Sequence, residues 1–385
     1  MRPAFASGAL VIVSVALALL IGEAVVRLLD IGPEFHAISY DNFQLSENPV
    51  LGYELWPNSA DGNHRISDQG LRDEHYAVAK PDGVFRIAVI GDSITFGLRV
   101  AREANYTERL EYLLNAHMTG RAARYEVLNF GVVGYNITQI AENLRARVST
   151  YQPDLVIYGY CLNDPQEYSL EMQRLLYLAA HRESGGAQKI PGVHSLLQRS
   201  QLFMLFEYLT SQHVALRSEA AFAPEEQLHW RNDPQFSAIA GSRHVEYFGR
   251  LHSVEGGWRR VEEGMQTISE FTTAPVVGVI FPLLEDLENY RLRPVHEKVG
   301  RQFASSAEGV VDLLDTFASF AKSMPRPVGI DALHPSEEGH WLAAGVITTY
   351  LAGHGFLPGI DARAVPRIVA DPNLRALSLS SILQP

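Results

Sequence analysis

The sequence predicts a doubly wound α/β domain with a five-stranded parallel sheet. From Phe85 onward, short and nearly continuous apolar runs alternate with amphipathic stretches of helix length. This pattern is typical of a parallel sheet covered by helices on both faces. The runs expected as strands are Phe85–Ile90, Glu126–Phe130, Leu155–Tyr160, Val276–Phe281 and Val310–Leu314. Ligands of such folds collect at the carboxyl ends of the strands, so we expect the site there.

The length of 385 residues fits one large domain with appendages. About 115 residues separate the third and fourth expected strands, which is far more than a crossover helix needs, so we expect a helical insertion at about 166–260. It starts at the carboxyl edge of the sheet and is therefore expected to border the site. The crossover helix before the fourth strand is expected at Trp258–Phe271. The expected divisions are an irregular or β-hairpin-bearing segment at 31–80, a main domain at 81–355 and a C-terminal tail at 356–385.

Residues 1–30 predict a membrane anchor. Ala4–Gly22 is an uninterrupted run of apolar and small residues, with Arg2 before it and Glu23 and Arg27 after it. A run of this length is roughly enough to cross the hydrocarbon core of a bilayer as a helix of about 20 residues. Because the cleavage pattern after the run is poor, we expect an uncleaved transmembrane signal anchor, with the catalytic domain on the extracytoplasmic side.

Composition excludes several classes of partner and cofactor. The net charge of −12 argues against binding to a nucleic-acid backbone, since that affinity comes mostly from Lys and Arg. The single cysteine, Cys161, leaves no intramolecular disulfide and no CxxC metal pair. His296-Glu297 begins like a zinc-protease helix, but Gly300 occupies the place of the second histidine, so we expect a solvated helix face there. No cofactor or metal is expected.

Ser93 follows directly on the first expected strand, in the sequence Gly91-Asp92-Ser93. A serine in this place can equally be a helix N-cap. The second and third expected strands run into Asn129–Asn136 and Gly159–Pro165, which both carry Gly and Asn at their carboxyl ends. These ends converge on Ser93 in a parallel sheet. There is no Gly-x-Ser-x-Gly pattern around Ser93, which argues against the α/β-hydrolase fold.

Asp331 and His334 lie far downstream in the sequence Asp-Ala-Leu-His-Pro. A serine nucleophile needs a base to take its proton, and a carboxylate to orient and stabilise that base when it is protonated. One loop supplies both groups here. Alone, such a pair is more often a turn aspartate beside a surface histidine, since the chain has 14 histidines. A catalytic role for the pair is better supported here because it follows the Ser, Gly and Asn segments in order.

In this order the segments resemble the SGNH (GDSL-type) hydrolases, whose four sequence blocks carry Ser, Gly, Asn and His in turn. The resemblance covers roughly residues 85–350 without the insertion. The matching residues are Gly91-Asp92-Ser93, Gly134 within Asn129–Gly134, Asn163 within Gly159–Asp164, and Asp331 to Pro335. The resemblance implies a three-layer α/β/α, flavodoxin-like fold. The third block departs from the commoner Gly-x-Asn-Asp, because it is Gly-Tyr-Cys-Leu-Asn-Asp.

The resemblance also implies roles for the site residues. Ser93 would be the nucleophile and His334 the base, with Asp331 behind it. The oxyanion hole would consist of the backbone N–H groups of Ser93 and Gly134 and the side-chain amide of Asn163. Such donors stabilise the negative oxygen that forms when an ester carbonyl is attacked. Gly131 is an alternative to Gly134 as the donor of the second block.

The function expected from these residues is that of a membrane-anchored serine esterase. It would cleave O-acyl esters on surface or exported carbohydrate through an acyl-Ser93 intermediate. One alternative is an O-acyltransferase that uses the same site and passes the acyl group to a sugar hydroxyl. Another is a catalytically silent carbohydrate-binding protein on the same fold.

Overall fold

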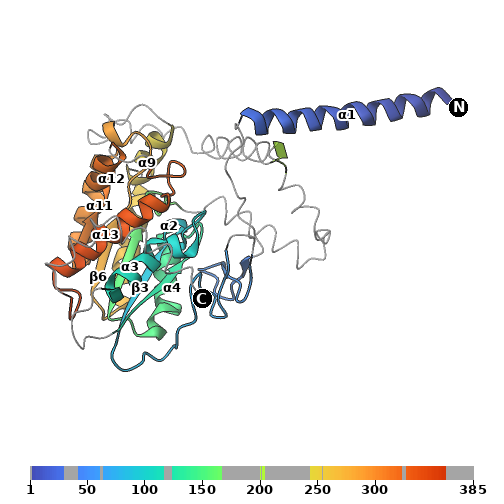
Figure 1. Ribbon diagram of the computed structural model, residues 1–385. Coiled ribbons are helices and arrows are strands. Elements are labelled where there is room, and N and C mark those ends of the chain that lie inside the picture. Colours follow the sequence, from blue (N-terminus) through green and yellow to red (C-terminus); the bar gives the residue numbers. More distant parts are fainter. Residues whose placement is uncertain are drawn as a thin grey trace. The chain divides into compact units, whose positions relative to one another are not determined.

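The computed structural model describes residues 2–29, 42–60, 64–116, 124–166, 200, 202–203, 243–253, 255–322 and 327–360 (Figure 1). The chain divides into two compact units. One unit comprises Met1–Ser39 and Leu178–Pro224, and the other comprises Tyr40–Tyr177 and Glu225–Pro385. The second unit contains the sheet and every residue predicted for the site.

The first unit contains helix α1 (Arg2–Leu29). The Glu23 carboxylate accepts hydrogen bonds from the Ser200 hydroxyl, at 2.7 Å, and from the Leu202 N–H, at 2.9 Å. Helix α1 lies where the sequence predicts a transmembrane anchor. In the described part of the chain, the structure contains no helix that combines the length and the hydropathy of a membrane span. The transmembrane anchor therefore stays a prediction from the sequence.

The second unit is built around a five-stranded parallel sheet, as predicted. Its strands are β3 (Val84–Gly91), β4 (Arg124–Gly131), β5 (Leu155–Tyr160), β6 (Val276–Ile280) and β7 (Gly309–Asp312). The strand order is β4-β3-β5-β6-β7, and all four neighbouring pairs are parallel. Every expected strand overlaps an observed one. The apolar runs were informative because both faces of these strands are buried: all six residues of β5, for example, are inaccessible.

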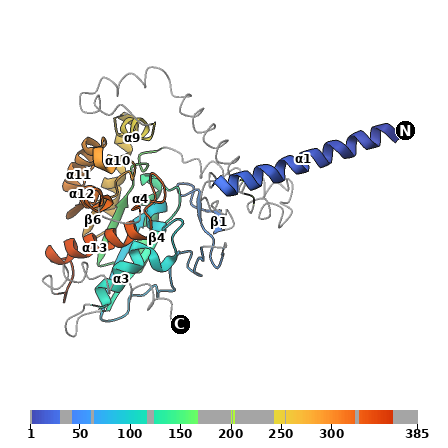
Figure 2. The ribbon, with the colours of Figure 1, turned by 45° about the horizontal axis from the view of Figure 1, so that its top comes forward.

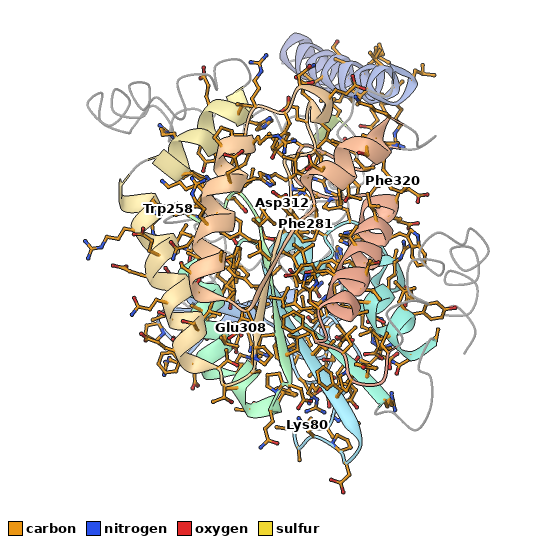
Figure 3. The ribbon with its side chains drawn as sticks, turned by 90° about the vertical axis from the view of Figure 1, so that its left-hand side faces the viewer. Lys80, Trp258, Phe281, Glu308, Asp312 and Phe320 are labelled. Atoms are coloured by element: carbon orange, nitrogen blue, oxygen red, sulfur yellow. The ribbon has the colours of Figure 1, made fainter. Side chains whose placement is uncertain are left out.

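Helices form the two outer layers. The described helices of these layers are α3 (Tyr106–Ala116), α4 (Ile137–Ala146), α10 (Glu255–Phe271), α11 (Arg293–Ser306), α12 (Leu314–Ala321) and α13 (Glu337–Gly353). Helix α13 packs beside α3 and α12, and α10 packs beside α4 and α11. Figure 2 shows α3 and α13 side by side. In Figure 3, Trp258 of α10 and Phe320 of α12 lie on opposite sides, with Phe281 after β6 between them.

The carboxyl ends of the strands lie toward the upper part of Figure 3. Glu308, just before β7, is below Asp312, which ends this strand. Shorter elements lie between these: α2 (Ser93–Phe96) directly follows β3, the 3₁₀ turn η2 (Arg102–Ala104) follows α2, η3 (Val148–Tyr151) lies between α4 and β5, and η4 (Leu287–Asn289) follows β6. Because β3 to β7 are all parallel, the segments that follow them meet at one edge.

The segment predicted at 31–80 contains a β-hairpin in its described part. Strand β1 (Phe43–Leu45) pairs antiparallel with β2 (Tyr53–Leu55), in a register that places Phe43 opposite Leu55. Residues 31–41 and 61–63 lie outside the described residues. The described part of this segment therefore contains one antiparallel hairpin.

The predicted insertion at about 166–260 lies mostly outside the described residues, as does the tail from residue 361. The described end of the insertion is helix α9 (Arg243–Ser253). Helix α10 includes the crossover helix predicted at Trp258–Phe271. The Nδ1 atom of His244 in α9 lies 3.0 Å from the Glu285 carboxylate in the loop after β6. That the rest of the insertion borders the site stays a prediction.

The expectation of a solvated helix face at His296 is wrong. His296 is buried in α11, where its Nδ1 atom lies 2.8 Å from the Asp312 carboxylate and its Nε2 atom lies 2.9 Å from the Tyr290 hydroxyl. The imidazole therefore joins the end of β7 to the loop after β6. The prediction was wrong because His296 stands among charged residues in the sequence, which gives no sign that its own position on the helix faces inward.

Candidate active site

Ser93 is held at the end of a buried strand by a very short helix. Strand β3 ends at Gly91, Asp92 is the N-cap, and Ser93 is the first residue of α2. The Asp92 carboxylate accepts a hydrogen bond of 2.9 Å from the N–H of Ile94, as an N-cap aspartate should. Ser93 is therefore placed at the carboxyl edge of the sheet by backbone geometry, and its hydroxyl also lies 3.4 Å from the carboxylate of the Asp92 cap.

The structure brings Ser93, His334 and Asp331 into one hydrogen-bonded chain. The Oγ atom of Ser93 lies 2.9 Å from Nε2 of His334. On the other side of the imidazole, Nδ1 lies 2.9 Å and 3.0 Å from the two carboxylate oxygens of Asp331. Nucleophile, base and orienting carboxylate thus lie in the order that nucleophilic serine chemistry requires.

The loop at Asp331 sets the geometry of its own carboxylate. The N–H groups of Leu333 and His334 both donate to Oδ1 of Asp331 at 2.8 Å. Burial acts to raise the pKa of Asp331, but the hydrogen bond and charge of His334 and the two backbone N–H groups outweigh it and lower the pKa below its usual range. Asp331 therefore stays ionised and can stabilise a protonated imidazole.

Arg99 is a further partner of Asp331 that sequence reasoning missed. Its guanidinium donates to Oδ2 of Asp331 at 2.8 Å, the oxygen that also lies 2.9 Å from Nδ1 of His334. Arg99 adopts a left-handed backbone conformation with φ of 67°. Arg72 fixes both flanks of this residue, because its guanidinium donates to the carbonyls of Gly97 and Val100 at 2.5 Å. No motif marks Arg99 in the sequence.

The resemblance assigns the backbone N–H groups of Ser93 and Gly134 to the oxyanion hole. Among the described residues, neither N–H group has a hydrogen-bond partner. The loop that carries Gly134 is joined to the other strand ends, because Val132 N–H donates to the Gly91 carbonyl at 3.2 Å and Ile137 N–H donates to the Asp164 carbonyl at 3.0 Å. The three strand ends are thereby held together.

The choice between Gly131 and Gly134 is decided by what each N–H does. The Gly131 N–H donates to the side-chain oxygen of Asn129 at 2.9 Å, so it has no hydrogen left for a substrate. A Cβ atom on Gly131 would lie 2.2 Å from the Phe96 nitrogen, which makes this glycine a packing position under α2. The Gly134 N–H carries no such bond, and this residue has φ of 77°. Gly134 is the better candidate donor.

Asn163 lies beside Asp92 on the third strand end. Its side chain hydrogen-bonds the Asp92 carboxylate, and its Oδ1 atom is buried without a partner among the described residues. An oxyanion requires a donor, so the role that the resemblance gives Asn163 requires its amide nitrogen to turn from Asp92 toward the substrate. Asp92 therefore competes with the substrate for the amide nitrogen of Asn163.

Two buried carboxyl groups lie under the site. Burial raises the pKa of Asp92, partly offset by the Ile94 N–H and the charge of His334. Burial and the nearby Asp92 raise the pKa of Asp164 well above its usual range, although the Tyr158 hydroxyl donates to it at 2.6 Å. Asp331, whose pKa is lowered, is the carboxyl group that contacts His334. No group of His, Cys, Asp and Glu in the described ranges is arranged to hold a metal ion.

The chain belongs to the GDSL-like lipase/acylhydrolase family, whose model matches residues 89–342. The matched part contains all five predicted site residues. The chain is therefore a carboxylic ester hydrolase by class, and the family resemblance found in the sequence is confirmed. No curated protein matches this sequence.

Several solved structures are similar to this chain. An acetylxylan esterase from Geobacillus stearothermophilus is 16% identical over 68% of this chain and 92% of its own, with a TM-score of 0.38. An alpha/beta hydrolase enzyme from the metagenome of Lake Arreo, Spain, is 17% identical over 70% and 95%, with a TM-score of 0.40. A two-domain esterase active on acetylated mannans is 16% identical over 72% of this chain, with a TM-score of 0.36. This chain spans 51% of that two-domain esterase.

Proposed function

We propose that this protein is a serine esterase that hydrolyses O-acyl ester bonds, with O-acyl groups such as O-acetyl on surface or exported carbohydrate as its substrate class. One observation carries the catalytic part of the proposal. Ser93 Oγ and the Asp331 carboxylate lie at hydrogen-bonding distance from opposite nitrogens of His334, both at 2.9 Å. This is the arrangement needed for a serine to lose its proton while it attacks.

In the first half of the reaction, Ser93 Oγ forms a bond to the ester carbonyl carbon while its proton passes to Nε2 of His334. The carbonyl oxygen becomes an oxyanion and accepts hydrogen bonds from the N–H groups of Ser93 and Gly134 and from Asn163. His334 then gives its proton to the alcohol oxygen as the carbon–oxygen bond breaks. The alcohol leaves, and the acyl group remains on Ser93.

In the second half, water takes the place of the alcohol. His334 accepts a proton from the water as its oxygen attacks the acyl carbon, and then returns this proton to Ser93 Oγ as the acid leaves. The sum is ester and water to acid and alcohol, with the enzyme unchanged. Asp331 stabilises the imidazolium in both halves, and its lowered pKa keeps it ionised for this task.

The substrate class and the location of the enzyme rest on the N-terminus. The apolar run Ala4–Gly22 supports attachment to a membrane, with the catalytic domain on the extracytoplasmic side. Large apolar side chains are exposed along the described part of α1, including Val13, Leu17 and Leu20. An esterase held at the outer face of a membrane meets acylated glycans, which is why we favour this substrate class.

Labelling with a fluorophosphonate tests the catalytic proposal, because the reagent reports nucleophile, base and oxyanion donors together. We expect the full-length protein to be labelled at Ser93 and to release free acetate from an acetylated xylo-oligosaccharide. Ser93→Ala should abolish both, whereas Ser319→Ala, at an exposed serine of α12, should change neither. Acetyl transfer to an acceptor sugar without free acetate would replace hydrolysis by acyl transfer. Absence of labelling would refute a reactive serine.

Fractionation of cells that express the full-length protein tests the location. We expect the uncleaved protein in the membrane fraction, and the variant without residues 1–30 in the soluble fraction with its esterase activity retained. A protease added to spheroplasts should digest the catalytic domain if it faces outward. Full-length, uncleaved protein in the soluble fraction would refute the anchor.

A further inference from the structure

The loop that carries Gly134 is a tight turn whose middle peptide has a defined orientation. Tyr135 N–H donates to the Val132 carbonyl at 3.2 Å, which closes a four-residue turn with Val133 and Gly134 at its centre. Gly134 has φ of 77° and Val133 is not among the residues with positive φ. These angles define a type II turn, which needs φ near +80° at its third residue. Type I and type II turns differ mainly by a flip of the middle peptide, here Val133–Gly134.

Whatever holds the Val133 carbonyl also sets the direction of the Gly134 N–H. The two groups belong to one planar trans peptide, so they point in opposite directions. The donor that the site needs is therefore controlled from the far side of the turn. The Gly134 N–H itself has no partner among the described residues.

The N-terminal hairpin supplies the group on that far side. The hydroxyl of Tyr53, in strand β2, donates to the Val133 carbonyl at 2.6 Å. In return the Tyr135 hydroxyl donates to the Tyr53 carbonyl at 2.5 Å, and the two rings pack edge to face at 5.2 Å. Gln139 adds a third bond, from its amide to the Leu51 carbonyl at 2.7 Å. Tyr53 is 1% exposed and Val133 is 3% exposed, so the bond between them is shielded from water.

We propose that Tyr53 is a positioning residue for the oxyanion hole: its hydroxyl holds the Val133–Gly134 peptide so that the Gly134 N–H faces the carbonyl oxygen attacked by Ser93. A hydrogen bond to the carbonyl of a peptide also polarises that peptide and strengthens its N–H as a donor. This role rests on the proposed function, since it assumes attack by Ser93. It gives the hairpin at residues 43–55 a part in catalysis, although the hairpin contributes no group that touches substrate.

The variant Tyr53→Phe tests the role. It keeps the ring and removes only the hydroxyl, which frees the middle peptide to flip. We expect kcat for p-nitrophenyl acetate to fall about tenfold with KM within about twofold, because loss of a whole oxyanion donor costs on the order of 10² to 10³ in kcat. The affinity for phenylboronic acid, which forms a tetrahedral adduct on the serine, should fall in parallel.

Tyr135→Phe is the matched control. It removes a buried hydroxyl of the same pair, which also donates to a backbone carbonyl, but leaves the bond from Tyr53 to Val133. Its melting temperature should fall about as much as that of Tyr53→Phe, whereas its kcat should stay within about twofold of the wild type. A kcat for Tyr53→Phe near the wild-type value, or an equal loss of kcat in Tyr135→Phe, would overturn the proposal.

A measurement on the wild-type protein covers the case in which Tyr53→Phe does not fold. In full-length protein labelled with ¹⁵N, the Gly134 amide proton should move downfield when phenylboronic acid is added. An unchanged resonance, with the adduct formed, would show that this N–H does not face the site and would overturn the proposal. Failure of the proposed function looks different, because then Ser93→Ala keeps the esterase activity, or the boronic acid does not bind at Ser93.

Discussion

The two halves of the candidate site meet at Ser93 but are built in different ways. The half that transfers protons consists of side chains, and both of them, His334 and Asp331, come from one loop three positions apart. The half proposed to stabilise the oxyanion, the donor half, consists mainly of backbone N–H groups that follow β3 and β4, with Asn163 after β5. A single loop orders the first half, whereas contacts between distant segments order the second.

This difference separates local from long-range control of catalysis. The N–H groups of Leu333 and His334 fix Asp331 within its own turn. The Gly134 N–H depends instead on the Tyr53 hydroxyl, which comes 80 positions before Val133, the residue whose carbonyl it holds. Changes to the first half should alter how the rate depends on pH, and changes to the second should lower kcat without altering that dependence. Kinetics can therefore distinguish the two halves.

The largest effect is expected from the residue that both halves share and from its base. Ser93→Ala and His334→Ala should each lower kcat/KM for p-nitrophenyl acetate by on the order of 10⁴-fold or more, because the two groups act as a unit. The double variant should lose little more than either single one. Circular dichroism should show intact folds. Appreciable turnover by either single variant would contradict the assignment of the proton-transfer half.

The next largest effect is expected in the donor half. Asn163→Ala should lower kcat by on the order of 10² to 10³, as loss of one oxyanion donor does. The shape of its pH–rate profile should not change, since the proton-transfer half is intact. Asn289→Ala, at an exposed residue of η4, serves as the control. A small loss in Asn163→Ala would mean that the amide stays on Asp92 and that the backbone N–H groups act without it.

The parts of the fold that could be predicted are those whose apolar residues follow a regular pattern along the sequence. Parallel strands with both faces buried appear as continuous apolar runs, so each of the five was located. The hairpin was foreseen only as a possibility within 31–80, because turn residues indicate a reversal without specifying what the strands contact. Its pairing with the Gly134 loop through Tyr53 has no local signal, since a tyrosine in a short strand is ordinary.

The same limit applies to the site. Asp331 and His334 could be found because their spacing and order match a family pattern, and the structure places them together with Ser93. Arg99 could not, because its importance comes from a contact with a residue 232 positions away. The choice of Gly134 over Gly131 required knowing which N–H is already bonded. Backbone donors are invisible in a sequence, since every residue except proline has one.

A smaller effect is expected from Arg99, which contacts Asp331 of the proton-transfer half. Arg99→Met removes a positive charge beside Asp331, so the carboxylate should stabilise the protonated imidazole of His334 more strongly. The acidic limb of the pH–rate profile should then move up by about 0.5 to 1 pH unit, with a loss of less than about tenfold on the plateau. Arg102→Met is the control, because Arg102 pairs with Glu74 and Glu108 instead. An unmoved limb would contradict the electrostatic role.

Glu111 hydrogen-bonds to strand β4, the strand that leads into the Gly134 loop. It offers a test of whether pH acts on stability separately from catalysis. Its carboxyl accepts hydrogen bonds from the Val127 N–H in β4, at 2.6 Å, and from the Tyr76 hydroxyl, at 3.1 Å. Burial raises the pKa of Glu111 to about 7, helped by the nearby Glu108 and opposed by the Val127 N–H. The folded protein therefore keeps this proton to a higher pH than the unfolded chain does.

The smallest effect follows from that shift. As pH rises from the ordinary pKa of a glutamate through about 7, the unfolded chain loses the proton first, so the free energy of unfolding should fall over this window. Glu111→Gln should remove on the order of 2 kcal/mol of this fall, measured by urea unfolding at pH 5 and pH 8. Its activity profile should match the wild type. Glu142→Gln is the contrasting control: hydrogen bonds from Arg145 lower the pKa of Glu142, so the stability that the wild-type carboxylate contributes is lost only as pH falls below the ordinary pKa of a glutamate, and this variant should keep the wild-type difference between pH 5 and pH 8. Equal pH dependence in Glu111→Gln and the wild type would show that Glu111 is not the group that titrates.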